Sequence, residues 1–124
     1  MIFMNRSTDI GTRYTSPMHD TPNTEPSQTD IASMRGPVLL EFGAAWCGYC
    51  RAARSMIDEA LTDHPQVRHL RIEDGKGKRL GRMYRVKLWP TLVLLRDGQE
   101  LGRLVRPTAI TALHQLLATT DTVS

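Results

Sequence analysis

Cysteine is scarce in this sequence: the 124 residues include only two, Cys47 and Cys50. So few thiols exclude the disulfide framework that holds many small secreted domains together. A structural zinc site usually needs four ligands, and the four histidines are scattered without finger-like spacing. We therefore expect no bound metal. Two explanations of the pair stay open, a redox dithiol and two inert buried thiols.

Long apolar runs are also missing. No stretch of about 18 apolar residues exists, so we expect no transmembrane helix and no membrane contact. Residues 1–6 do not combine a basic start with the apolar stretch of a secretory signal, and we therefore predict a cytoplasmic protein.

Aromatic residues are few, at 6% of the chain, whereas basic residues are concentrated in one segment. Six of the twelve residues from Lys76 to Lys87 are Lys or Arg. The simplest interpretation is a solvated face; an acidic protein partner is the alternative. Nucleic acid binding is not favoured, because no aromatic side chains alternate with these charges as a stacking platform.

Composition divides the chain into an arm and a domain. Residues 1–23 are rich in Ser, Thr, Asn, Asp and Pro, and we expect a flexible N-terminal arm with a short strand near Arg13–Thr15. Residues 24–124 form the predicted domain. It opens with a short helix that has Thr24 as N-cap and Pro26 in its first turn, and that ends near Arg35.

Hydrophobic periodicity predicts alternating strands and helices in the rest of the domain. Strands are expected where apolar residues run together or alternate, and helices where they recur every three to four residues. The predicted strands are Val38–Phe42, Val67–Ile72, Thr91–Leu95 and Glu100–Val105. The predicted helices run from Cys50 to before Pro65, around Leu80–Tyr84, and from Pro107 onward. Asp97 and Gly98 give the hairpin turn between the last two strands.

The two cysteines lie where a strand turns into an amphipathic helix. If Cys47 caps this helix, its sulfur faces free backbone N–H groups and the positive end of the helix dipole. Both effects lower a thiol pKa, and only the thiolate attacks a disulfide. Cys50 would lie one turn into the helix, more buried and within reach of Cys47. Cys47 is therefore the predicted nucleophile and Cys50 the predicted resolving thiol.

Two segments resemble the signatures of thioredoxins. The first runs from Glu41 to Cys50, and the second is Trp89-Pro90-Thr91 followed by an apolar strand and Asp97-Gly98. The resemblance covers residues 36–118. It implies an α/β thioredoxin fold, in which a central mixed β-sheet is flanked by helices on both faces.

The resemblance also implies roles for individual residues. Cys47 matches the exposed nucleophile, and Pro90 matches a cis-proline that leaves the backbone of Trp89 free to pair with a substrate strand. Glu41 matches a buried acid that accepts the proton of Cys50, and we expect burial to raise its pKa. His69 lies near the position of a lysine that flanks this acid. The expected substrate-binding residues are Trp46, Gly48, Tyr49, Trp89, Pro90 and Thr91.

The resulting hypothesis is a protein-disulfide reductase that needs no cofactor beyond its redox-active Cys47–Cys50 pair. Protein disulfides would be its substrates, a thioredoxin reductase its electron donor, and a monomer its simplest state. Tyr49 replaces the proline that thioredoxins usually have between the cysteines, so a disulfide isomerase or oxidase is the first alternative. The second is a non-catalytic binding module that uses the basic segment Lys76–Lys87.

Overall fold

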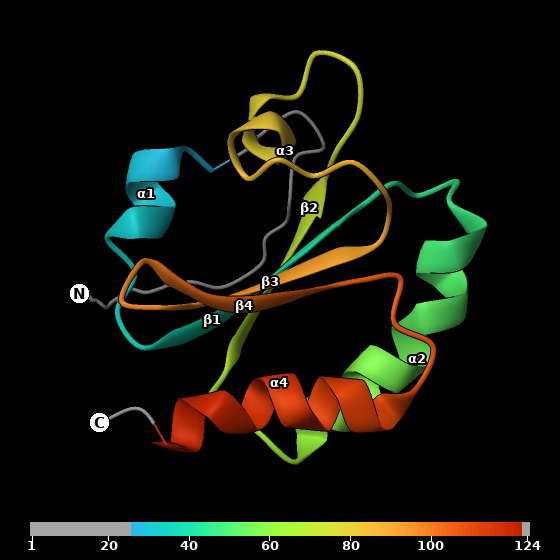
Figure 1. Cartoon of the computed structure of the whole chain (residues 1–124). Helices are drawn as coiled ribbons and strands as arrows, with labels where there is room; N and C mark the ends of the chain where they lie inside the picture. Colours follow the sequence, from blue (N-terminus) through green and yellow to red (C-terminus); the bar gives the residue numbers. More distant parts are fainter. Residues whose placement is uncertain (1–25, 123–124) are drawn as a thin grey trace.

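The computed structural model describes residues 26–122, which form four helices and four strands (Figure 1). Their order matches the alternation predicted for the domain. In chain order they are α1 (Gln28–Ala32), β1 (Pro37–Gly43), α2 (Gly48–Thr62), β2 (Arg68–Glu73), α3 (Arg79–Met83), β3 (Thr91–Arg96), β4 (Gln99–Val105) and α4 (Ile110–Thr122). None of the described helices is long and apolar enough to cross a membrane.

The strands form one mixed sheet in the order β2-β1-β3-β4. The β1 and β2 strands are parallel and joined through α2, whereas β3 pairs antiparallel with both β1 and β4. The β3–β4 hairpin turns at Asp97 and Gly98, whose positive φ values of 51° and 82° suit the predicted tight turn. The predicted thioredoxin fold is confirmed by this architecture.

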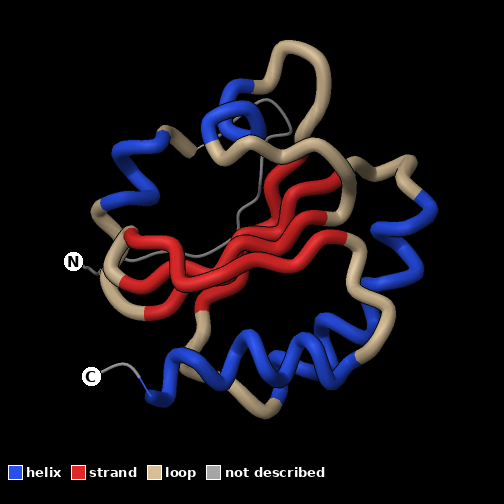
Figure 2. Tube along the Cα trace, in the orientation of Figure 1, coloured by secondary structure: helices blue, strands red, loops and turns tan. Residues whose placement is uncertain are grey.

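Two helical layers bury the two faces of the sheet (Figures 1 and 2). The α2 and α4 helices cover one face, and α1 and α3 cover the other. Successive residues of β1 supply both cores: Leu39 packs in the cluster with α2 and α4, while Leu40 packs in the cluster with α1 and α3. This double burial explains why β1 is an almost continuous apolar run.

Several predicted boundaries are wrong. The first helix begins at Gln28, because Ser27 and Asp30 form a capping box at 2.9 and 3.2 Å, and it ends at Ala32. The last helix begins at Ile110 rather than near Pro107, because the Arg106 N–H donates to the carbonyl of Pro90 and holds this segment against another loop. The predicted Thr24 cap, residues 1–23 and the strand at Arg13–Thr15 lie outside the described residues.

The strand register gathers three loops at one end of the sheet. Phe42 near the end of β1 pairs with Thr91 at the start of β3, and Thr91 pairs with Val105 at the end of β4. The loops that follow β1, precede β3 and follow β4 therefore meet there, as Figure 2 shows. The cysteines and the Trp89-Pro90-Thr91 segment both belong to this end.

Candidate functional site

Cys47 is the N-cap of α2, as the sequence predicted, although the helix begins at Gly48 and not at Cys50. The extended backbone of Cys47 (φ −78°, ψ 118°) turns its sulfur back over the first turn of the helix. Its Sγ accepts a hydrogen bond from the Cys50 N–H at 3.2 Å. The helix thus directs one of its free backbone donors at this sulfur.

The surroundings of Cys47 lower its pKa. Burial acts in the opposite direction, but hydrogen bonds from the Cys50 thiol and from the backbone of Cys50 and Tyr49 outweigh it. The positive charge of Arg106 lowers the pKa further. Cys47 is therefore the thiol that ionises first.

Cys50 has the opposite environment, one turn inside α2. Burial raises the pKa of its thiol to about 11, and its hydrogen bond to Cys47 and the charges of Cys47 and Glu41 add to the effect. Exposure does not separate the two cysteines: Cys47 is 5% exposed and Cys50 is 3% exposed. The expectation of an exposed outer sulfur is thus wrong, and electrostatics distinguish the pair.

Glu41 is buried in the centre of the sheet, on β1, and is only 3% exposed. Its Oε1 lies 2.7 Å from His69 Nε2 and accepts a hydrogen bond from Arg71 Nε at 3.2 Å. Burial raises the pKa of Glu41, but these two partners on β2 outweigh it and leave the pKa lowered. The predicted rise in this pKa is therefore wrong, because the sequence does not reveal that β2 aligns two basic side chains with the acid.

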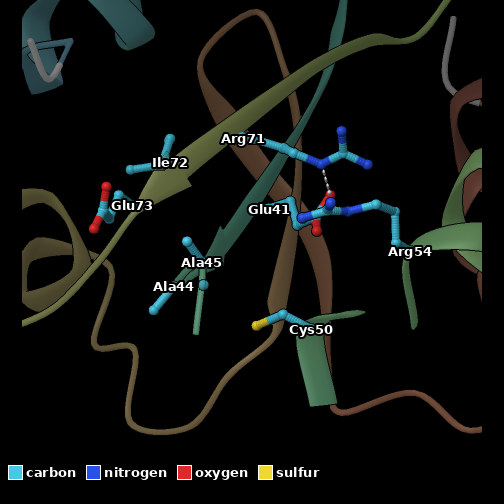
Figure 3. A pocket seen from close by; sticks show the side chains of 9 residues that line it. Glu41, Ala44, Ala45, Cys50, Arg54, Arg71, Ile72 and Glu73 are labelled. Carbon is cyan, nitrogen blue, oxygen red and sulfur yellow. Dashed lines mark hydrogen bonds and ion pairs between the residues drawn. The ribbon is translucent and has the colours of Figure 1, made fainter. Parts of the chain in front are cut away.

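A cavity of about 210 Å³ adjoins both Glu41 and Cys50. In Figure 3, Glu41 lies between Arg71 on β2 and Cys50 on α2, and Arg54 extends from α2 along the same space. The cavity is therefore polar on one side and is lined by the Cys50 thiol on the other. Among residues 26–122, no group of three or more His, Cys, Asp or Glu is arranged to hold a metal ion.

The Trp89–Pro90 peptide bond is cis, and Trp89 packs against the cluster of Ala44, Cys47 and Cys50. The Trp46 and Trp89 rings meet edge to face at 5.2 Å, so the two sequence signatures are in contact. Trp46, at 73%, and Tyr49 are exposed beside the thiols, as is Gly48.

Pro90 and Thr91 are buried, unlike the exposed Trp46, Gly48 and Tyr49. The Thr91 hydroxyl donates to the Leu88 carbonyl at 2.6 Å. This hydrogen bond holds the turn before β3, so the side chain of Thr91 acts within the fold and not at the surface.

Two residues at the site were missed by the sequence interpretation. The Trp89 indole donates to Asp74 Oδ2 at 2.9 Å, so Asp74 braces the tryptophan. Arg106 donates from Nε to the Trp89 carbonyl at 2.8 Å and lies 4.0 Å from the centre of the Tyr49 ring. Both residues are in loops without hydrophobic period, and only the tertiary structure brings them to the cysteines.

Taken with the fold, this geometry places the chain among the thioredoxin-fold proteins.

Comparison with known proteins agrees with the geometry. Residues 20–119 match the family model for thioredoxin. A thioredoxin of Aspergillus fumigatus, Asp f 28, is 30% identical over 82 residues, which are 66% of this chain and 76% of that protein. A thioredoxin of Mycobacterium tuberculosis is 32% identical over 78 residues, 62% of this chain and 67% of that protein.

Solved structures give the same result. Thioredoxin 2 from Pseudomonas aeruginosa, in its reduced form, is 43% identical, with a TM-score of 0.71 over 81% of this chain and 97% of that one. The present chain therefore belongs to the thioredoxin family. Membership of that family implies a thiol–disulfide oxidoreductase.

Proposed function

We propose that this protein reduces protein disulfides through a mixed disulfide on Cys47. The Cys47 thiolate attacks one sulfur of a substrate disulfide, a bond forms between the two sulfurs, and the other substrate sulfur leaves as a thiolate that takes up a proton. The observation that carries this proposal is the environment of Cys47: an N-cap position, donors from Tyr49 and Cys50, and a lowered pKa.

Cys50 then resolves the mixed disulfide. Its thiol loses a proton and attacks Cys47 Sγ, which releases the second substrate sulfur as a thiolate and leaves a Cys47–Cys50 disulfide. The charge on Cys47 helps to keep Cys50 protonated. Once Cys47 is bonded to substrate that charge is gone, so the pKa of Cys50 falls when its thiolate is needed. The cavity between Cys50 and Glu41 offers the departing proton a polar path.

Substrate would bind across the exposed surface around the thiols. Trp46, Gly48 and Tyr49 would contact it on one side, and the backbone of the Trp89–Thr91 segment on the other. A thioredoxin reductase would return the disulfide to the dithiol, with no further cofactor. Such a cycle fits a monomer in a reducing compartment, and we infer the cytoplasm.

The first test is insulin reduction by the dithiol protein. The two single-thiol variants are matched, since each loses one sulfur atom. Cys47→Ser should abolish activity, whereas Cys50→Ser should accumulate mixed disulfides that mass spectrometry detects. Failure of the folded wild-type protein to reduce insulin, or trapping by Cys47→Ser instead of Cys50→Ser, contradicts the proposal.

A redox titration decides the direction of electron flow. Tyr49 between the cysteines is the observation that favours an isomerase or oxidase. A reductase should have a reduction potential of about −270 mV, and an isomerase should have one of about −180 mV. We expect the first value.

A further inference from the structure

Arg106 connects the two halves of the site. It follows β4, and its backbone N–H donates to the Pro90 carbonyl at 2.9 Å. Its side chain donates to the Trp89 carbonyl and stacks on the ring of Tyr49, one of the two residues between the cysteines. A guanidinium over an aromatic face gains cation–π attraction, so its plane is fixed beside the thiols.

The backbone of Arg106 is in the left-handed region, with φ 49°. A residue with a Cβ adopts this conformation at a cost of about 1 kcal/mol, which glycine would avoid. The chain therefore holds a long cation at a strained position next to its nucleophile. Strain of this kind is concentrated at functional sites.

The contact with Trp89 changes how a substrate can bind. The resemblance to thioredoxins implies that a substrate strand pairs with the backbone of Trp89, and Arg106 Nε takes one of the two acceptor positions of that carbonyl. Within residues 26–122 no hydrogen bond or ion pair is formed by the two terminal nitrogens of Arg106. A substrate that approaches Cys47 therefore meets a cation whose terminal donors are not taken by this part of the chain.

Two further basic side chains lie in the segment that precedes Trp89. Lys87, two residues before Trp89, is exposed, and so is Arg85. Asp74 is the carboxylate that contacts Trp89, and its Oδ2 accepts the hydrogen bond of the indole N–H. An acidic group on the substrate is the chemistry that complements this rim, because Arg pairs with a carboxylate through two parallel hydrogen bonds.

We propose that Arg106 is a specificity-determining residue that selects disulfides flanked by Asp or Glu. This inference rests on the proposed reductase function. The carboxylate of the substrate takes the terminal nitrogens of Arg106 while the neighbouring cysteine reaches Cys47. A structural alternative, in which Arg106 only ties Tyr49 to the Trp89 loop, predicts no dependence on substrate charge.

The test uses two disulfide-linked peptides that differ only by Glu or Gln beside the cysteine. Single-turnover rates with the dithiol protein are followed by tryptophan fluorescence. Wild type should react about fivefold faster with the Glu peptide, the upper range for an exposed ion pair, and 1 M salt should reduce this ratio. For each protein variant, the rate with the Glu peptide is divided by the rate with the Gln peptide. A change in the reactivity of Cys47 affects both rates equally and therefore does not alter this ratio.

Arg106→Gln should bring the ratio to about one, and Arg106→Lys should keep part of the preference because it keeps the charge. Arg68→Gln is the matched control, since it removes an exposed charge at the opposite end of the sheet, where Arg68 pairs with Val38; its ratio should equal that of wild type. A wild type that reduces both peptides equally, or an Arg106→Gln variant that keeps the preference, overturns the inference alone. A wild type that reduces neither peptide nor insulin overturns the proposed function as well.

Discussion

At the scale of single residues, the site depends on making two identical side chains chemically different. Cys47 and Cys50 are three residues apart and equally buried, yet one has a lowered pKa and the other a pKa of about 11. The N–H donors and Arg106 act on the first sulfur, whereas Glu41 and the charge of Cys47 act on the second. A thiol–disulfide exchange with an ordered sequence of attacks requires this difference.

This difference predicts the pH dependence of alkylation. Iodoacetamide should modify Cys47 in the dithiol protein at pH values below 9, the ordinary pKa of a thiol, while Cys50 should require pH values approaching 11. Peptide mass spectrometry after timed quenching measures each rate separately. Equal rates at pH 7 would contradict the proposed roles of Cys47 as nucleophile and Cys50 as resolving thiol.

The control removes one donor to Cys47. Cys50→Ala loses the side-chain hydrogen bond that lowers the pKa of Cys47, so that pKa should rise and alkylation at neutral pH should slow. Cys50→Ser, whose hydroxyl can replace the thiol as donor, should stay closer to wild type.

At the scale of elements, strand ends and turns decide where the functional side chains meet. The hairpin between β3 and β4 packs directly against the backbone of α1. Gly98 has φ 82°, and a Cβ there would collide with the backbone of Ala32 in α1. The turn therefore needs glycine both for its conformation and for the approach of the helix.

Gly98→Ala should destabilise the protein by about 2 kcal/mol, since it adds backbone strain and a steric clash with Ala32. Gly36→Ala is the matched control: Gly36 has φ 78° but open space around it, so it suffers strain alone and should lose about 1 kcal/mol. Urea unfolding measures both. Equal losses would show that α1 does not rest on the hairpin as described.

At the scale of the whole molecule, one polar network connects three elements across the sheet. Glu41 on β1 binds His69 and Arg71 on β2, and Arg71 Nη2 reaches Asp58 Oδ1 on α2 at 3.2 Å. A buried carboxylate that lacked such partners would be strongly destabilising. The network therefore allows an acid to lie in the middle of the core beside Cys50.

The lowered pKa of Glu41 predicts how stability depends on pH. Its folded-state pKa lies below the ordinary value of 4.5, so the stabilisation is fully present above pH 4.5 and is lost as the pH falls through the folded pKa. Glu41→Gln should cost about 2 kcal/mol at pH 7 and should flatten the decline in acid.

Glu100→Gln supplies the comparison. Glu100 also has a lowered pKa, through its hydrogen bond to Arg103, but this pair is on the surface. Its loss should cost about 0.5 kcal/mol or less. Urea unfolding from pH 3 to 7 distinguishes the two variants, and equal acid sensitivity of Glu41→Gln and wild type would contradict the role of the network.

The sequence by itself determined the order of elements and the dithiol. Apolar runs, amphipathic spacing and the Asp97-Gly98 turn are local signals, because each reflects the period of one strand, helix or turn. The position of Cys47 at a helix start follows from the same local pattern. The sequence did not determine the exact ends of the helices. A short helix begins at whichever of several possible N-cap residues forms the capping hydrogen bond, here Ser27.

Only the tertiary structure decided the electrostatics of the site. The pKa of Glu41 depends on His69 and Arg71, which are about 30 residues away in sequence and meet it only through the parallel register of β1 and β2. Arg106 binds the Trp89 carbonyl and lowers the pKa of Cys47 only because β4 ends beside the start of β3. Electrostatic effects act through space between residues that are distant in the chain, and no local pattern reveals them.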